Sequence, residues 1–168
     1  MDSIEQISRR RFAAMMSAIA AAAPAATAAD EGWVSLFDGR SLNGWRASEN
    51  KTAWKVIDGC LAADGGRSHL FYEGPVQGAG FRNFELEAEV ISQPLANSGI
   101  FFHTAYQESG WPAKGFEIQV NNSATGEGSY RERKKTGSLY GVRNVYKAMA
   151  NDGEWFKLHI AVRQKNVQ

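Results

Sequence analysis

Hydrophobic and polar residues alternate along several short segments of the chain, a pattern that is typical of half-buried β-strands. From Asn83 to Ser92, apolar side chains occupy every second position and glutamates occupy most positions between them. Trp155–Arg163 and Phe116–Asn121 alternate in the same way. Because successive strand residues point to opposite faces of a sheet, each segment predicts a strand with one face on a core.

Shorter apolar segments extend this pattern. Trp54–Ile57 and Cys60–Ala63 flank Asp58-Gly59, a dipeptide that favours a two-residue hairpin turn. Further strands are expected at Trp33–Phe37, Arg67–Tyr72 and Gly99–Thr104. Beyond residue 29, no segment shows the spacing of an amphipathic helix. The pattern therefore predicts an all-β domain over residues 30–168, folded as an antiparallel β-sandwich.

Two regions qualify this picture. Ser123–Lys135 is polar and contains glycine, which predicts an exposed, mobile loop with a basic cluster. The last expected strand, Trp155–Arg163, lies close to the final residue. An unpaired strand at a sheet edge is a template for aggregation. We therefore expect that one or two closing strands are missing at the C-terminal end.

The first 29 residues have the order of an export signal. Ser8–Phe12 contains a twin-arginine pattern, an Ala/Met-rich segment follows to Ala23, and Ala26–Ala28 offers a signal-peptidase site. The apolar segment is shorter than the roughly 20 residues that span a bilayer. The pattern predicts export by the twin-arginine translocase to the periplasm or the medium, and a terminal helix is the alternative.

Charge argues against one large class of function. Without the three arginines and two acidic residues of the export segment, the totals of 19 basic and 18 acidic residues become 16 of each. A nucleic-acid-binding protein normally carries a basic excess. The motifs of serine hydrolases, zinc proteases and P-loop proteins are also missing from the sequence.

No cofactor is predicted. The histidines at 69, 103 and 159 are too widely spaced to indicate a metal site. A divalent cation held by a carboxylate and loop carbonyls stays an alternative.

The strongest candidate site is a polar face on Phe116–Asn121. Glu117 and Gln119 share the face that Phe116 and Ile118 avoid. His103, at the end of the preceding apolar segment, would add a proton-transfer group beside Glu117. A solvated outer face explains Glu117 equally well, so both interpretations stay open.

Aromatic residues add a second signal. Trp and Tyr stack on sugar rings, while amide, carboxylate and imidazole groups hydrogen-bond to sugar hydroxyls. Any of these aromatic residues can instead pack in the core or cap a loop. The candidates are Trp111, Tyr106, Tyr130, Tyr140 and Trp155.

Seven short motifs, in order along the mature chain, resemble the 3-keto-disaccharide hydrolase domain family. They are Leu36–Trp45, Trp54–Gly59, Asn83–Leu86, Asn97–Phe102, Gly115–Val120, Thr136–Gly141 and Gly153–Trp155. Two features depart from the family pattern. The family continues after the last motif with an Asn-Gly turn and more strands, and it often has Asp where this chain has Asn121 and Asn122.

The resemblance implies a concanavalin-like jelly roll that hydrolyses 3-keto-glycosides or 3-keto-disaccharides by elimination and hydration. On that reading Glu117 and His103 are the acid/base pair. Sugar-binding roles fall to Gln119, Asn97, Tyr140, Trp111 and Trp155. A sugar 3-dehydrogenase is the implied pathway partner. The alternative function is a non-catalytic carbohydrate-binding β-sandwich.

Overall fold

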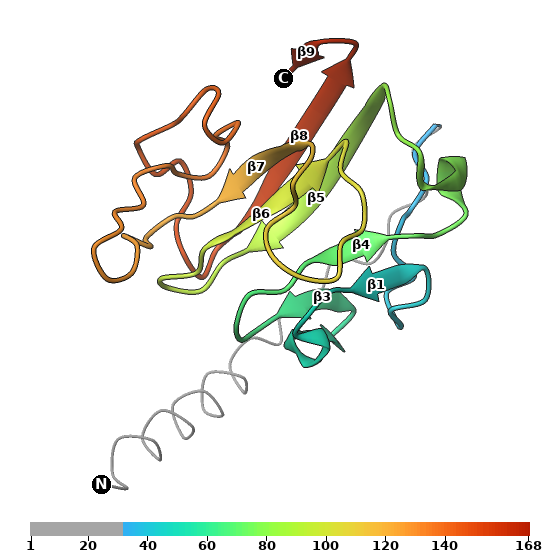
Figure 1. Cartoon of the computed structure of the whole chain (residues 1–168), viewed down its shortest axis with the longest axis horizontal. Coiled ribbons are helices and arrows are strands. Elements are labelled where there is room, and N and C mark those ends of the chain that lie inside the picture. Colours follow the sequence, from blue (N-terminus) through green and yellow to red (C-terminus); the bar gives the residue numbers. More distant parts are fainter. Residues whose placement is uncertain (1–31) are drawn as a thin grey trace, which may run out of the picture.

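The computed structural model describes residues 32–168, so the predicted export signal at residues 1–29 lies outside the described residues. This range forms nine strands in four small antiparallel sheets and contains no α-helix (Figure 1). The strands are β1 (Trp45–Ala47), β2 (Trp54–Ile57), β3 (Cys60–Ala63), β4 (Leu70–Tyr72), β5 (Phe84–Ile91), β6 (Ser98–Phe102), β7 (Phe116–Val120), β8 (Trp155–Arg163) and β9 (Asn166–Val167). Two 3₁₀ turns, η1 (Lys51–Ala53) and η2 (Val76–Ala79), lie between strands.

The alternating segments became strands as expected. β5 pairs with β8 over its whole length, and β8 pairs in turn with β9. β6 pairs with β7, so that Ile100 lies opposite Ile118. β2 and β3 form the predicted hairpin around Asp58 and Gly59. Both turn residues have positive φ, 50° and 76°, which a two-residue turn of this kind requires. The all-β, antiparallel prediction is confirmed.

One hydrophobic core is formed between the β6–β7 sheet and the β5–β8–β9 sheet. Phe102 and Ile118 come from the β6–β7 sheet, and Ile160 and Val162 come from the β5–β8–β9 sheet. All four side chains are buried. Partly buried residues packed against them are Phe84, Leu86, Ile100, Leu139 and Val167. The opposite faces of β6 and β7 are therefore available for polar residues.

The N-terminal part differs from the prediction. Trp33–Phe37 does not form a strand, because its backbone finds no partner strand; the Leu36 carbonyl instead accepts a hydrogen bond from the Trp45 indole at 3.0 Å. Trp45–Ala47, for which no strand was expected, is strand β1 and pairs with β4. Strand β4 begins at Leu70, three residues later than predicted.

Within residues 32–168, no helix is long and apolar enough to cross a membrane.

Candidate functional site

The register of β6 and β7 creates two rows of side chains on the face away from the core. Glu117 lies directly opposite Phe101, and Gln119 lies opposite Gly99. Because Ile118 is buried in the core, alternation turns Glu117 and Gln119 to the other face. The predicted polar face on β7 is therefore formed by the strand pairing itself.

A third segment extends both rows. Leu139 forms an antiparallel bridge with Ile118, and the Tyr140 backbone N–H donates to the Glu117 carbonyl at 2.9 Å. The Gln119 N–H donates to the Ser138 carbonyl at 2.9 Å. Residues opposite each other in an antiparallel pair share a face, so Tyr140 joins Glu117. The first row therefore reads Phe101, Glu117, Tyr140 across the sheet.

The Glu117 side chain folds back over Gly99. A Cβ atom on Gly99 would overlap Glu117 Oε1 and lie 2.8 Å from its Cδ, so a side chain at position 99 would displace the carboxyl. The carboxyl is half-buried. Burial raises the pKa of Glu117 from 4.5 to about 7; the negative charge of Glu132 adds to the effect and the Lys134 ammonium partly offsets it. Near neutral pH this carboxyl can both accept and release a proton.

A methyl group at position 99 tests this arrangement. Gly99→Ala is expected to push the Glu117 carboxyl off the strand toward solvent, because the displaced group is the end of a flexible side chain. The free energy of unfolding should change by less than about 1 kcal/mol. The pKa of Glu117 should fall toward its ordinary value, which a carboxyl carbon NMR titration would measure. An unchanged pKa would contradict the proposed packing.

Gln119 and Asn97 form the second polar pair. Gln119 is 1% exposed, and its amide nitrogen donates to Asn97 Oδ1 at 2.7 Å. In the opposite amide orientation the Gln119 nitrogen would donate to the Ser98 carbonyl at 3.3 Å and to Glu117 Oε1 at 3.2 Å. The pairing of β6 with β7 therefore brings Gln119 close to Glu117, on the face that their spacing predicted, and to Asn97, which precedes β6.

The segment after β7 is a loop whose two ends, Asn121 and Thr136, are hydrogen-bonded to each other; we call this pair of residues the neck of the loop. The Asn121 N–H donates to Thr136 Oγ1 at 2.9 Å, and the Thr136 N–H donates back to the Asn121 carbonyl at 3.0 Å. The Asn121 amide nitrogen also donates to the carbonyls of Lys134, at 2.9 Å, and Ala124, at 3.3 Å. Asn121 is fully buried. These bonds tie the two ends of the loop together beside Gln119.

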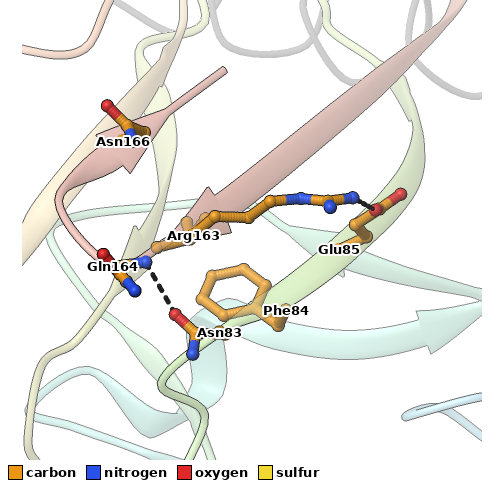
Figure 2. Close-up of a pocket in the computed structure, with 7 residues that line it drawn as sticks. Asn83, Phe84, Glu85, Arg163, Gln164 and Asn166 are labelled. Carbon is orange, nitrogen blue, oxygen red and sulfur yellow. Dashed lines mark hydrogen bonds and ion pairs between the residues drawn. The ribbon is translucent and has the colours of Figure 1, made fainter.

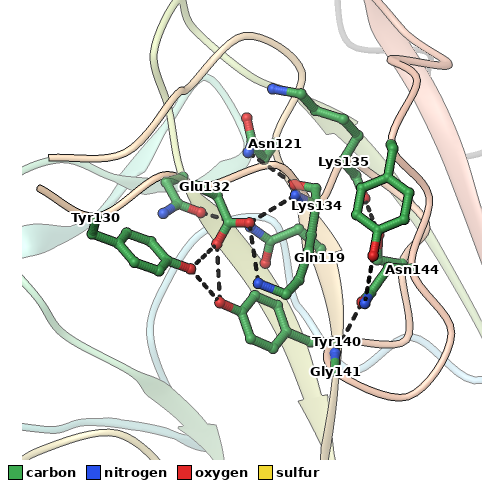
Figure 3. A network of polar contacts seen from close by, with 12 residues as sticks. Gln119, Asn121, Tyr130, Glu132, Lys134, Lys135, Tyr140, Gly141 and Asn144 are labelled. Atoms are coloured by element: carbon green, nitrogen blue, oxygen red, sulfur yellow. Dashed lines mark hydrogen bonds and ion pairs between the residues drawn. The ribbon is translucent and has the colours of Figure 1, made fainter.

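The loop returns a buried carboxylate to the site (Figure 3). The Glu132 side chain is 1% exposed. It accepts hydrogen bonds from the hydroxyls of Tyr130 at 2.7 Å and Tyr140 at 3.0 Å, and from the Lys134 N–H at 2.7 Å. The Lys134 ammonium lies 3.5 Å from the carboxylate and 4.2 Å from the centre of the Tyr140 ring. The expectation of an exposed loop is therefore wrong at Glu132.

This network fixes the charges around Glu117. Burial opposes ionisation of Glu132, but bonds from Tyr130, Tyr140 and the Lys134 N–H, with the Lys134 charge, lower its pKa below 4.5. Burial also opposes the charge on Lys134, yet its contacts with Tyr140 and Glu132 raise its pKa. The bond to Glu132 raises the pKa of Tyr130. Glu132 is thus ionised at neutral pH beside a Glu117 that titrates there, and two such carboxyls are suited to different roles.

Sequence reasoning missed Glu132. The available signal was the two-residue spacing of Tyr130, Glu132 and Lys134, which places them on one side of an extended segment. The polar composition of Ser123–Lys135 predicts a solvated Lys134, whereas this side chain is partly buried against Glu132.

His103 is not brought to Glu117. Its φ of 54° breaks the alternation of the strand that ends at Phe102. The ring instead packs edge-on against Phe84 and Phe102 on the core side, and Nε2 lies 2.9 Å from the Arg82 carbonyl. The expected pairing of His103 with Glu117 is therefore not part of the site geometry.

The two predicted tryptophans have different surroundings. Trp155 begins β8 opposite Ile91, and alternation with the buried Ile160 places it on the outer face of that sheet, with half its surface exposed. Trp111 lies in the loop between β6 and β7, where its ring contacts His69, a residue that itself contacts Phe101. The structure thus connects Trp111, but not Trp155, with the Glu117 row.

No metal cluster marks this face in the described part of the chain. Among residues 32–168, no three His, Cys, Asp or Glu side chains are arranged to hold a metal ion. A hollow of about 510 Å³ lies elsewhere, where β5, β8 and β9 meet (Figure 2). The Glu85 carboxylate in this hollow is already paired with Arg163 and His159. Two of its other lining residues, Phe84 and Val162, are apolar residues of the hydrophobic core. We therefore place the site on the Glu117 face.

Comparison with known proteins decides the family. The sequence model of the 3-keto-alpha-glucoside-1,2-lyase-like domain matches residues 32–168. The chain belongs to this family. This member of the 3-keto-alpha-glucoside-1,2-lyase-like family carries Glu117, Gln119 and Tyr140 on adjacent segments of one sheet face.

The family assignment agrees with one curated relative. The chain is 33% identical over 79 residues to a 3-keto-disaccharide hydrolase of Bacteroides thetaiotaomicron, an alignment that covers 43% of this chain and 27% of that protein. The matched region therefore spans about a quarter of the relative's length. No solved structure matches the chain.

Proposed function

We propose that the chain cleaves glycosides whose sugar ring already carries a ketone at C3, and that Glu117 transfers the proton at C2. The observation that supports this most strongly is the half-buried Glu117 carboxyl, with a pKa of about 7, on a rigid strand pair. A carboxyl with such a pKa is suited to general acid–base catalysis near neutral pH.

The reaction needs only one carboxyl to move protons. The C3 ketone acidifies the C2–H bond, so a base can take that proton and leave an enolate across C2 and C3. When the ketone re-forms, the electron pair makes a C1=C2 double bond and the C1–O bond breaks. The leaving oxygen takes a proton, and water then adds to C1 while C2 is protonated. The net change is hydrolysis without the paired carboxylates of ordinary glycosidases.

The surrounding groups have distinct roles. Ionised Glu117 takes the C2 proton, and the resulting acid returns it to the leaving oxygen. The Lys134 ammonium, which the ionised Glu132 keeps charged, stabilises the enolate oxygen. The exposed Asn97 hydrogen-bonds to a sugar hydroxyl, and the buried Gln119 amide holds Asn97 in place by donating to its Oδ1. The Tyr140 hydroxyl is held by Glu132. His103 has no role here, because it faces the core side.

The wider context of this activity is also a proposal. The shared core of the β5–β8–β9 and β6–β7 sheets supports the interpretation of the fold as a concanavalin-like β-sandwich. The ketone must be supplied by an oxidation at C3 of the sugar, the work of a sugar 3-dehydrogenase. The twin-arginine pattern supports a location of the reaction outside the cytoplasm.

Turnover of oxidised and unoxidised sugar tests the function. Maltose oxidised at C3 of its non-reducing glucose should be cleaved, and maltose itself should remain intact, because only the ketone acidifies C2. In D₂O the released 3-keto sugar should carry deuterium at C2, which NMR would detect. If neither sugar is consumed and both bind equally in calorimetry, the chain is a carbohydrate-binding module instead.

A further inference from the structure

A second cluster lies on the other side of Phe101 from Glu117. The His69 ring, just before β4, is 5.6 Å from the Phe101 ring and 5.4 Å from the Trp111 ring, in edge-to-face contacts. Phe101 is directly opposite Glu117, so their Cβ atoms are about 5 Å apart. The cluster therefore begins one side chain away from the proposed catalytic carboxyl.

Trp111 is exposed but held in place. Its side chain is 63% exposed, and its backbone carbonyl accepts a hydrogen bond from the Gln107 amide at 2.6 Å. The Arg67 guanidinium lies 5.6 Å from the ring centre and is fixed by two bonds to Glu49, at 2.9 and 3.2 Å. An exposed aromatic ring with a fixed orientation is suited to stacking on the apolar face of a sugar.

His69 offers a hydrogen-bonding group beside that ring. Its Nδ1 is buried without a hydrogen-bond partner, and no protein bond to Nε2 occurs in the described part of the chain. An unprotonated Nδ1 in this apolar position leaves the N–H on Nε2, where it can donate to a ligand oxygen. Burial lowers the pKa of His69, with the nearby Glu49 charge opposing and the Arg67 charge assisting, so the ring is neutral at neutral pH.

We propose that His69, Phe101 and Trp111 form the subsite for the leaving-group sugar of a disaccharide. The ring of that sugar stacks on Trp111 and one of its hydroxyls accepts a bond from His69 Nε2. This inference rests on the proposed function, which places the oxidised ring at Glu117. It makes the chain selective for disaccharides over glycosides with a small leaving group.

Two substrates separate this subsite from the catalytic groups. Trp111→Ala should lower kcat/KM for C3-oxidised maltose by about tenfold or more and change that for C3-oxidised methyl α-glucoside less than twofold. His69→Ala should show the same selectivity, and His69→Gln, which keeps a donor near Nε2, should recover part of the loss. Trp33→Ala is the matched control, because that tryptophan is 39% exposed and contacts His159 on the outer face of β8, so it should affect neither substrate.

Equal losses on both substrates, or no loss on either, would overturn the subsite. If the unsubstituted chain cleaves neither substrate, the proposed function fails, and the subsite is then judged by calorimetry with unoxidised maltose. Weaker maltose binding by Trp111→Ala, but not by Trp33→Ala, would support it, and unchanged binding by both would overturn it. Thermal unfolding of each variant confirms that the comparison is between folded proteins.

Discussion

Glu117→Gln is expected to lower kcat for a C3-oxidised disaccharide by about 10²- to 10⁴-fold, the usual contribution of a positioned general base. The amide keeps the size of the carboxyl and its place over Gly99 but cannot accept the C2 proton. KM should change little, because Asn97, held in place by the buried Gln119, remains to bind the sugar. Deuterium exchange at C2 in D₂O should fall with kcat. Retention of exchange would assign the proton transfer to another group.

The pH dependence follows from the raised pKa. The base must be ionised, so kcat/KM should increase about tenfold per pH unit below pH 7 and level off above it. Glu132 is already ionised across this range because its pKa is lowered. A midpoint near 4.5 in the measured profile would contradict the role of burial at Glu117.

Stability should show the same titration with the opposite trend. The folded-state pKa of Glu117 is raised from 4.5 to about 7, so folding favours the neutral form. The resulting stabilisation is complete below pH 4.5 and is lost as pH rises through 7. Glu117→Gln should therefore be more stable than the unsubstituted chain at pH 8, by about 1–2 kcal/mol for this partly solvated group, and similar near pH 4.5. Urea unfolding at the two pH values would measure the difference.

Glu132→Ala is expected to destabilise the domain by about 3–5 kcal/mol, because it removes one partner of a buried charged network. The substitution leaves the hydroxyls of Tyr130 and Tyr140 and the partly buried Lys134 ammonium without their shared acceptor. Urea unfolding at pH 7 would measure the loss. The pKa of Glu117 should also fall, since the neighbouring negative charge is gone.

An exposed ion pair provides the control. Glu87 and Lys157 lie 2.8 Å apart on the outer face, with 38% and 55% of their side chains exposed. Glu87→Ala should cost no more than about 1 kcal/mol, because exposed pairs contribute little. Equal losses for the two variants would show that burial of Glu132 has no special weight.

The strands that could be predicted are those whose pattern is complete within the segment. Phe84–Ile91 and Trp155–Arg163 each alternate over a full strand, and the structure pairs them along their length. Trp33–Phe37 has the composition of a strand but no partner, and a strand exists only through pairing. Trp45–Ala47 pairs with β4 although three residues carry too little pattern to show it.

The residues of the candidate site also fall into those that the sequence could place and those that it could not. Glu117 and Gln119 could be placed together because they are two residues apart on one strand. The burial of Glu132 depends on the fold of the loop, which local composition does not determine. The orientation of His103 depends on a single positive φ, and the contact of His69 with Phe101 joins segments distant in sequence.

The neck formed by Asn121 and Thr136 separates the part of the chain that positions Glu117, strand β7, from the loop that follows it. The hydrogen bonds at the neck involve Asn121, Thr136 and main-chain carbonyls, and the buried network uses Tyr130, Glu132 and Lys134, so few demands fall on the exposed residues 127–129 at the tip of the loop. That stretch can gain, lose or exchange residues over evolutionary time while β7 keeps Glu117 in position. A family built this way can change the tip of this loop and leave strand β7 unaltered.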